Sequence, residues 1–293
     1  MVGTNQAAVL IENMPHLQFQ FVVVTGTVYL MKLKMPQLLF FCAPTLIGCG
    51  TGTWVAELAV DTDVRTALET NAFNDGCTLM IDALPIVLLD TSVSNASGFV
   101  YGLSEFDNTL FDASVDSPIR LWDAELTALL YTAQHLHVRP GLATVLHESI
   151  DPEYGRSFDA NNGSIGLKGT LTCEDLSVTL DWAFSTSHQF SCDTKLKITE
   201  DIETKTTFLV DPSQWFRQST VEDGSDALLG QAIASADSND NGMISLNELQ
   251  AIPLNTLDGY DDDPEDRIET LYDHIEANTT RALKVGDQRC ASM

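Results

Sequence analysis

The sequence predicts a mainly β protein, an antiparallel β-sandwich with a small C-terminal α-helical EF-hand appendage. Three observations lead to this fold class. From residue 53 to residue 212, short apolar stretches alternate with turn residues, as in sandwiches built from many short strands. From residue 222 to residue 290, apolar residues recur instead at helical spacing. Within that helical region, the loop from Asp237 to Glu248 has the spacing of an EF-hand calcium site.

Seven apolar stretches of the first region are candidate strands. They cover residues 54–60, 77–81, 86–89, 98–102, 165–173, 176–184 and 206–210. Asn161-Asn-Gly-Ser164 predicts a tight turn, because Asn-Gly accepts the positive φ angles of a hairpin. Residues 124–134 fit a helix or a strand by composition alone.

Two helices are predicted in the second region. Residues 226–236 form the first, and Asp263-Pro264 opens the second with Asp as N-cap and Pro in the first turn. The apolar face of the first helix holds Leu228, Leu229, Ala232, Ile233 and Ala236. That of the second holds Ile268, Leu271, Tyr272, Ile275 and Ala282.

The loop between these helices carries an oxygen ligand at every position that an EF-hand uses. Calcium takes six to eight oxygen ligands, which this loop type supplies from positions 1, 3, 5, 7, 9 and 12. Those positions hold Asp237, Asn239, Asn241, Met243 through its backbone carbonyl, Ser245 and Glu248. Gly242 makes the sharp bend at position 6, and Glu248 closes the shell with both carboxylate oxygens. The sequence therefore predicts one bound Ca²⁺.

We expect this calcium to be weakly held and mainly structural. Only Asp237 and Glu248 bring full charges to the predicted shell. No second EF-hand is evident, and Pro253 cuts the following helix short. These features suit the affinity of extracellular modules, with Kd about 10⁻⁴ to 10⁻³ M. The competing interpretation is a degenerate loop that only turns between two helices.

The charge of the chain argues against nucleic acid as a partner. The sequence has 42 acidic and 15 basic residues, a formal net charge of −27. Phosphate backbones are bound by clustered Lys and Arg, and the sequence has no such cluster. Cations are the natural partners of such a surface, although the acidity also fits a role in solubility alone.

The N-terminal region, residues 1–49, is predicted to direct export. Met31-Lys-Leu-Lys34 is a short cationic segment, and the apolar run after it is typical of a secretory signal. Residues 1–30 fit a signal poorly, so we interpret them as a gene-model extension ahead of a start at Met31. The alternative, a membrane span over 17–48, is divided by Lys32 and Lys34 into runs shorter than about 20 residues.

Leu46-Ile-Gly-Cys49 resembles a lipobox, the processing site of bacterial lipoproteins. The resemblance implies that Cys49 becomes the diacylated first residue of the mature protein. Two acyl chains would hold the acidic body at a membrane that its charge alone would not bind. We therefore expect an exported protein of the periplasm or cell surface, anchored as an outer-membrane lipoprotein.

Four cysteines remain for disulfides after processing at Cys49, and the oxidising compartment that export implies favours them. Four cysteines allow three connectivities. Cys173 and Cys192 lie at the start and end of two apparently adjacent strands, so we favour that pair. Cys77 with Cys290 would then tie the C-terminal tail to the body.

Other groups of residues give weaker predictions of a binding site or an activity. His135 and His137 share one face if their segment is a strand, which suits copper or zinc. The acidic cluster from Asp258 to Asp266 could bind a second cation, but we favour its role as a helix N-cap with a favourable helix dipole. No G-x-S-x-G, H-E-x-x-H or Gly-rich phosphate motif occurs, so we expect no catalysis. The four tryptophans are expected in the core.

Several segments together resemble a group of bacterial exported lipoproteins with a C-terminal EF-hand. These segments are Asp75-Gly-Cys77, Met80-Ile-Asp82, Asp181 to Thr186 followed by Cys192, residues 236–242 and Cys290. The resemblance covers most of residues 53–290 and implies the architecture above without an activity. The group carries His-rich positions in its last strand, where this chain has residues 210–216, Val-Asp-Pro-Ser-Gln-Trp-Phe. That departure weakens any transition-metal role taken from the group.

The predicted function is calcium ion binding by a single EF-hand loop in an exported, non-catalytic protein. The alternative is a periplasmic transition-metal or ligand-binding sandwich in which calcium is incidental. Loss of metal uptake in His137→Ala would favour this alternative. A calcium-dependent hydrolase would instead require Asp, His and Ser side chains to converge in a polar cleft.

Overall fold

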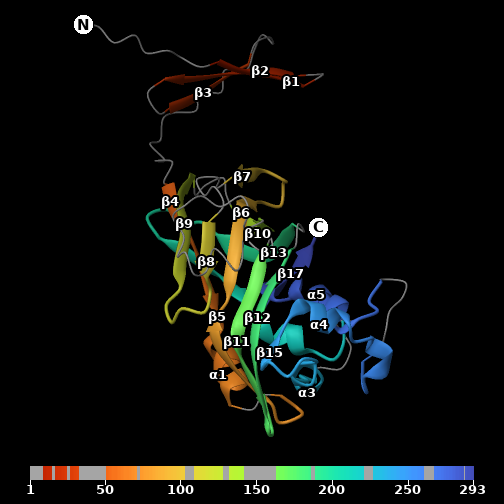
Figure 1. The fold of residues 1–293 in the computed structure, drawn as a ribbon. Helices are drawn as coiled ribbons and strands as arrows, with labels where there is room; N and C mark the ends of the chain where they lie inside the picture. Colours follow the sequence, from red (N-terminus) through yellow and green to blue (C-terminus); the bar gives the residue numbers. More distant parts are fainter. Residues whose placement is uncertain are drawn as a thin grey trace, which may run out of the picture. The chain divides into compact units, whose positions relative to one another are not determined.

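The computed structural model describes residues 9–14, 17–24, 27–32, 51–70, 73–102, 109–127, 132–141, 163–185, 189–220, 227–260, 267–286 and 288–293. The chain divides into two compact units, Met1–Gly48 and Cys49–Met293. The described part of the first unit is an antiparallel sheet (Figure 1). Its strands are β1 (Val9–Met14), β2 (Leu17–Val24) and β3 (Thr27–Lys32).

The predicted export signal overlaps the described residues only at the end of β3. Met31 and Lys32 belong to that strand. The apolar run, the lipobox and Cys49 lie outside the described residues.

The second unit is mainly β and is built on one curled, open sheet of 14 strands (Figure 1). The main path of the sheet runs β15-β12-β11-β6-β10-β13-β17-β16-β14-β4-β9, with β5 beside β11, and with β7 and β8 beside β6. The strands are β4 (Thr51–Val60), β5 (Thr78–Ala83), β6 (Pro85–Ser94), β7 (Val100–Gly102), β8 (Thr109–Asp112), β9 (Ile119–Thr127), β10 (Thr132–Pro140), β11 (Ile165–Cys173), β12 (Leu176–Phe184), β13 (Phe190–Lys197), β14 (Thr204–Val210), β15 (Met243–Ile244), β16 (Leu283–Val285) and β17 (Gln288–Ser292).

Short helices complete the described part of this unit. They are α1 (Thr62–Glu69), the 3-10 helices η3 (Pro212–Phe216) and η4 (Leu254–Thr256), and the α-helices α3 (Gln231–Ala234), α4 (Leu246–Gln250) and α5 (Leu271–Thr279). The side chain of Asp61 caps α1 by accepting a hydrogen bond from the backbone N–H of Asp63.

All seven predicted strands overlap observed ones, and the sheet is mixed rather than purely antiparallel. β14 pairs with β4 in parallel along its whole length, and β15 pairs with β12 in parallel. Parallel neighbours need a long connection, and more than 140 residues of chain separate β4 from β14. The ambiguous segment 124–134 supplies the end of β9 and the start of β10. The predicted turn at Asn161 and Asn162 lies outside the described residues.

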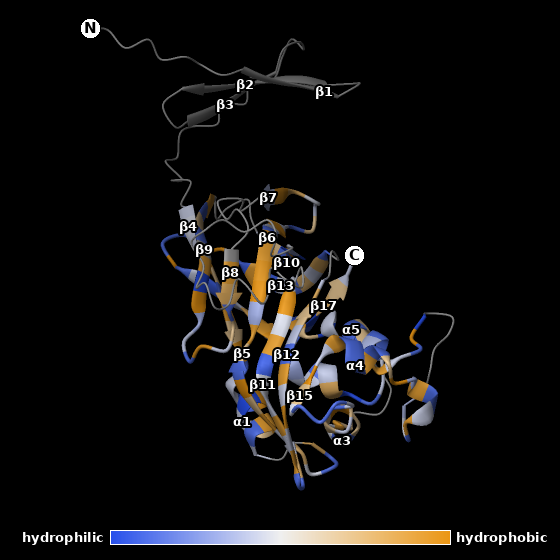
Figure 2. Ribbon diagram, in the orientation of Figure 1, coloured by the Kyte–Doolittle hydropathy of each residue, from blue (hydrophilic) through white to orange (hydrophobic). Residues whose placement is uncertain are grey.

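Alternation along the strands builds the core. In β12, Val178, Leu180 and Trp182 are buried, while the residues between them are exposed. β6 differs, because its first four residues are all buried, and Figure 2 shows its apolar colouring plainly. Trp54 and Trp215 are fully buried, as expected for core tryptophans, whereas the side chain of Trp122 is not among those described.

An aromatic cluster packs the C-terminal helices against the sheet. Phe184 of β12 contacts Trp215 of η3 and Tyr272 of α5, with ring centroids 6.0 and 5.9 Å apart. Trp182 stacks on Phe216 at 6.3 Å. The region predicted as helical therefore shares one core with the sheet, and it also contributes the strands β15, β16 and β17.

Both predicted helices are shorter than expected. The first is reduced to α3, because the backbone N–H groups of Leu228 and Leu229 donate to Asn74 Oδ1 and to the carbonyl of Phe216 instead of within a helix. The second begins at Leu271, where the Thr270 hydroxyl caps the helix and the Asp273 carboxylate bonds back to the N-cap backbone. The Asp263-Pro264 start lies outside the described residues, and Ala282 lies beyond the end of α5.

Candidate metal centre

The predicted calcium loop, 237–248, lies between α3 and α4, which contribute one turn of helix each. Three of the predicted ligand side chains curl the first half of the loop. Asp237 accepts from the backbone N–H of Gly242 at 2.7 Å through Oδ2, and Asn241 Oδ1 accepts from Met243 N at 2.7 Å. Asn239 Oδ1 accepts from Asn241 N at 3.1 Å. These oxygens therefore lie on the inside of a tight turn.

Backbone conformation fits this curvature at the expected residue. Gly242 has φ +75°, a left-handed conformation that glycine adopts without steric cost. Asp240 also has a positive φ, 55°, which Asp tolerates better than most residues. The sharp bend predicted at position 6 is confirmed.

Glu248 closes the second half of the loop over the first. Its Oε1 accepts from the N–H and hydroxyl of Ser238, each at 3.1 Å, and from Asn239 Nδ2 at 2.9 Å. Its Oε2 accepts from the N–H and hydroxyl of Ser245 at 2.9 and 2.8 Å. The hydrogen bond from the Ser245 backbone N–H, with the other donors, lowers the pKa of Glu248 although burial opposes this. The carboxylate is therefore ionised and oriented toward the loop at neutral pH.

The exit side of the loop is attached to the edge of the sheet. β15 pairs with β12, with Met243 opposite Thr179 and Ile244 opposite Leu180. The backbone N–H of Thr179 donates to Gly242 O at 2.8 Å. In the core, the indole N–H of Trp182 donates to the carbonyl of Ile244 at 2.9 Å. The exit side of the loop is therefore held at the edge of the sheet.

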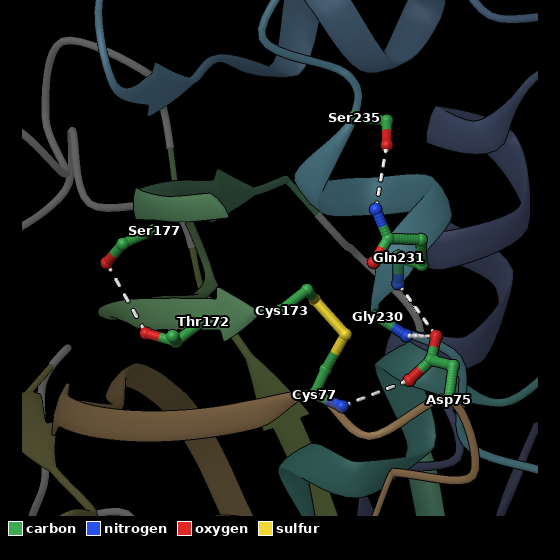
Figure 3. The surroundings of a disulfide bond; sticks show 8 residues. All are labelled: Asp75, Cys77, Thr172, Cys173, Ser177, Gly230, Gln231 and Ser235. Atoms are coloured by element: carbon green, nitrogen blue, oxygen red, sulfur yellow. Dashed lines mark hydrogen bonds between the residues drawn. A yellow bond between two sulfur atoms is a disulfide. The ribbon is translucent and has the colours of Figure 1, made fainter. Parts of the chain in front are cut away.

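The approach to the loop rests on Asp75 and on a disulfide (Figure 3). Asp75 Oδ2 accepts from the backbone N–H groups of Gly230 and Gln231, at 2.6 and 2.7 Å, where α3 begins. A Cβ atom on Gly230 would lie 2.8 Å from Cys77 Cβ, so only glycine allows this approach. Cys77 is bonded to Cys173, which ends β11. The segment that leads into the loop therefore packs directly on this cross-link.

The four predicted cysteines form disulfides, but the favoured pairing is wrong. The bonds are Cys77–Cys173 and Cys192–Cys290, not Cys173–Cys192 and Cys77–Cys290. The error has a topological cause, since β6 and β10 separate β11 from β13 in the sheet. Cys173 instead lies beside the start of β5, and Cys192 lies directly opposite Cys290 on β17. Two disulfides indicate folding in an oxidising compartment, as expected for an exported protein.

Two features that stabilise the loop were not predicted from the sequence. Asp75 reaches α3 across 155 residues, and Trp182 reaches Ile244 across 62. The Asp-Gly-Cys and Asp-Trp segments that contain them were noted only for their resemblance to other proteins. The spacing of residues within a short motif does not predict contacts between residues so far apart in the sequence.

The remaining predicted metal-binding groups lie elsewhere. His135 and His137 are on β10, outside the loop. Of the acidic cluster, Asp258 is described, whereas residues 261–266 lie outside the described part. Within the described ranges, no three His, Cys, Asp or Glu side chains converge as a metal-binding group. Only two predicted ligands of the loop 237–248 are of these types, Asp237 and Glu248, because the others are Asn, Ser and a carbonyl.

Comparison with family models, curated proteins and solved structures gives no match. The resemblance to exported lipoproteins therefore stays a prediction. Among the described residues, no helix is long and apolar enough to span a membrane.

Proposed function

We propose that this protein binds one calcium ion in the loop 237–248 and uses it as a structural clamp rather than for catalysis. The observation that carries the proposal is the closed loop itself. Oxygen atoms of Asp237, Asn239, Asn241 and Glu248 are held around one turn by hydrogen bonds from the loop backbone. Calcium prefers such a set of hard oxygen ligands in a flexible cage.

The predicted ligand roles can be assigned to this geometry. Asp237, Asn239 and Asn241 would supply side-chain oxygens, Met243 its carbonyl, and Ser245 a hydroxyl or a bridging water. Glu248 would exchange its contacts with Ser238 and Asn239 for bidentate coordination. That exchange is local, because the Ser245 capping interactions already hold the carboxylate above the loop.

A clamp role follows from the two attachments of the loop. One end packs on Asp75 and the Cys77–Cys173 bond, and the other pairs with β12. An ion that cross-links the two halves of the loop would join these attachments. Calcium at ten times its Kd would raise the free energy of unfolding by about 1.4 kcal/mol.

We also infer that the two halves of the curled sheet function as the layers of a sandwich with the EF-hand segment on one edge. In support, one core cluster joins Leu58 of β4 and Phe208 of β14 with Leu167 of β11 and Trp182 of β12. For location, we propose export and attachment through a lipidated Cys49, supported by the lipobox resemblance and by the two disulfides.

The calcium proposal is tested by calorimetric titration of the full chain with Ca²⁺ beside two variants. Glu248→Gln removes the charged ligand at position 12. Asp240→Asn makes the same charge change in the same loop, at an exposed position that EF-hands do not use as a ligand. We expect one site in the wild type, a Kd at least about tenfold weaker in Glu248→Gln, and little change in Asp240→Asn.

Absence of saturable binding at millimolar calcium would refute the proposal. Equal affinity of the wild type and Glu248→Gln would also refute it, because the ion would then bind elsewhere. Far-UV circular dichroism of each variant verifies that the fold is intact.

A further inference from the structure

A second group of ligand-type side chains lies on the face of the sheet formed by β6, β10 and β13. These three strands are neighbours, with β10 in the middle (Figure 1). His135 of β10 stands opposite Ser94 of β6 on one side and Asp193 of β13 on the other. Directly opposite residues of antiparallel strands point to the same face, and so do residues two apart in one strand. His135, His137 and Asp193 therefore share a face, while Leu136 between the histidines is buried in the core.

These side chains are near enough to reach one metal ion after small side-chain rotations. The ring centroids of His135 and His137 are 6.1 Å apart. An ion bonded at about 2.1 Å to one nitrogen of each ring lies about 3.2 Å from each centroid, which sets the centroids about 5.2 Å apart in a tetrahedral shell, so the rings must approach by about 1 Å. Asp193 and His135 are cross-strand partners, whose Cβ atoms lie about 5 Å apart.

Two of these side chains carry buried polar atoms without a hydrogen-bond partner. Within the described part of the chain, His137 Nδ1 and Asp193 Oδ1 accept and donate no hydrogen bond. Buried polar atoms are nearly always paired, so two orphan ligand atoms on adjacent strands need an explanation. The other atoms of both groups are engaged. His137 Nε2 bonds the hydroxyl of Ser94 at 2.8 Å, and Asp193 Oδ2 pairs with Lys195 Nζ at 2.7 Å.

We propose that His135, His137 and Asp193 form a site for a divalent transition-metal ion, Zn²⁺ or Cu²⁺. Imidazole nitrogen suits these ions, whereas the oxygen ligands of the loop 237–248 suit calcium. His137 would bind the ion through Nδ1, with Nε2–H donating to Ser94, as ligating histidines commonly donate through their second nitrogen. Water would complete the coordination shell.

The surroundings permit capture of an ion from solvent. His135 is exposed, so its ring can rotate to bring its nitrogen to the ion, and this movement is required because the three donors do not yet converge. A β-bulge beside Asp193, with Lys195 at φ 46°, alters the direction of the strand at this point.

The test is titration of the full chain with Zn²⁺ in the presence of millimolar Ca²⁺, followed by electron paramagnetic resonance of the Cu²⁺-loaded protein. The variants are His135→Ala, His137→Ala and Asp193→Asn. Arg139→Gln, two residues further along the same face of β10, serves as the matched control. We expect one equivalent of Zn²⁺, an affinity at least about tenfold weaker in each site variant, and no weakening in the control. The copper spectrum should show coupling to two nitrogens in the wild type and to one in either histidine variant.

This test is independent of the calcium proposal. Glu248→Gln should lose calcium and keep zinc, and His137→Ala should do the reverse. Unchanged zinc affinity in both histidine variants would overturn the proposed site, and so would a wild-type protein that binds no zinc. If His137→Ala fails to fold, the exposed His135→Ala variant decides the question.

Discussion

Trp182 connects the sheet to the loop 237–248 through a buried hydrogen bond. Its indole N–H donates to the carbonyl of Ile244, and both side chains are almost completely buried. Loss of the indole donor removes this buried hydrogen bond to the carbonyl. The loop thus depends on one side chain of β12 as well as on its own ligands.

Trp182→Phe should therefore destabilise the protein by more than a loss of packing alone. A buried acceptor left without its donor costs about 1 to 3 kcal/mol. Trp215→Phe is the matched control, because Trp215 is equally buried and its indole nitrogen has no hydrogen-bond partner among the described residues. Urea unfolding should show the extra loss in Trp182→Phe alone, together with weaker calcium binding. Equal losses in the two variants would contradict this role of Trp182.

At the level of single residues, the bend of the loop 237–248 could be predicted because all the predicted ligand positions lie within twelve consecutive residues. The bend at Gly242 and the inward carboxylate of Glu248 follow from that spacing. Asp75, Trp182 and Asp193 could not be assigned their roles in the same way. Each acts on a residue that is distant in sequence, and only the order of strands brings them together.

The Cys77–Cys173 bond, at the scale of elements, supports the segment that leads into the loop. Gly230 packs on Cys77. Asp75, which precedes Cys77 by two residues, accepts hydrogen bonds from the backbone at the start of α3. The Cys192–Cys290 bond joins β13 to β17, and neither strand neighbours β15 in the order of the described strands. The two disulfides close loops of similar length, 96 and 98 residues, so they offer a matched comparison.

Replacement of either disulfide by two serines should lower the free energy of unfolding by about 2 to 5 kcal/mol. The double variant that lacks Cys77 and Cys173 should also bind calcium several-fold more weakly, because α3 loses the surface on which it packs. The double variant that lacks Cys192 and Cys290 should keep its calcium affinity. Calorimetric titration of the two double variants, at a temperature where both are folded, distinguishes these effects. Equal calcium affinity in the two variants would argue that the cross-link does not support the loop.

Strands could be predicted at this scale more reliably than helices or cysteine pairs. Apolar alternation is a local signal, and it located β11 and β12 to the residue. The helix predicted over 226–236 fails because Asn74 and Phe216 compete for its backbone N–H groups. The predicted cysteine pairing is wrong because strands that follow one another closely in the sequence, such as β11 and β13, are not neighbours in the sheet.

The whole molecule carries a net charge of −27, which opposes the compact state through self-repulsion. Screening should relieve that repulsion, since the Debye length falls from about 30 Å at 0.01 M salt to about 8 Å at 0.15 M. We therefore expect the urea midpoint to rise when sodium chloride is added over this range. At constant ionic strength, calcium should raise the urea midpoint of the wild type further.

Glu248→Gln separates the two effects. It should retain the response to sodium chloride and lose the added response to calcium. If both proteins respond equally to calcium, the ion acts only through general screening of the acidic surface.

The sequence predicts a mainly β molecule, but not the order of its strands. Pairing of β4 with β14, and of β13 with β17, joins distant parts of the chain. Such pairings depend on which surfaces fit together in three dimensions. Composition and periodicity describe each segment separately and contain no information on its neighbours.

The attachment of β15 also bears on how the protein avoids self-association. β12 is the last long strand at its end of the sheet path, where only β15 lies beyond it. An uncovered edge strand presents free N–H and C=O groups to other molecules. The loop 237–248 covers that edge at Thr179 and Leu180. If the proposed calcium ion holds this loop in place, removal of the ion would leave the edge open to strands of other copies. Calcium depletion should then cause aggregation before the core unfolds.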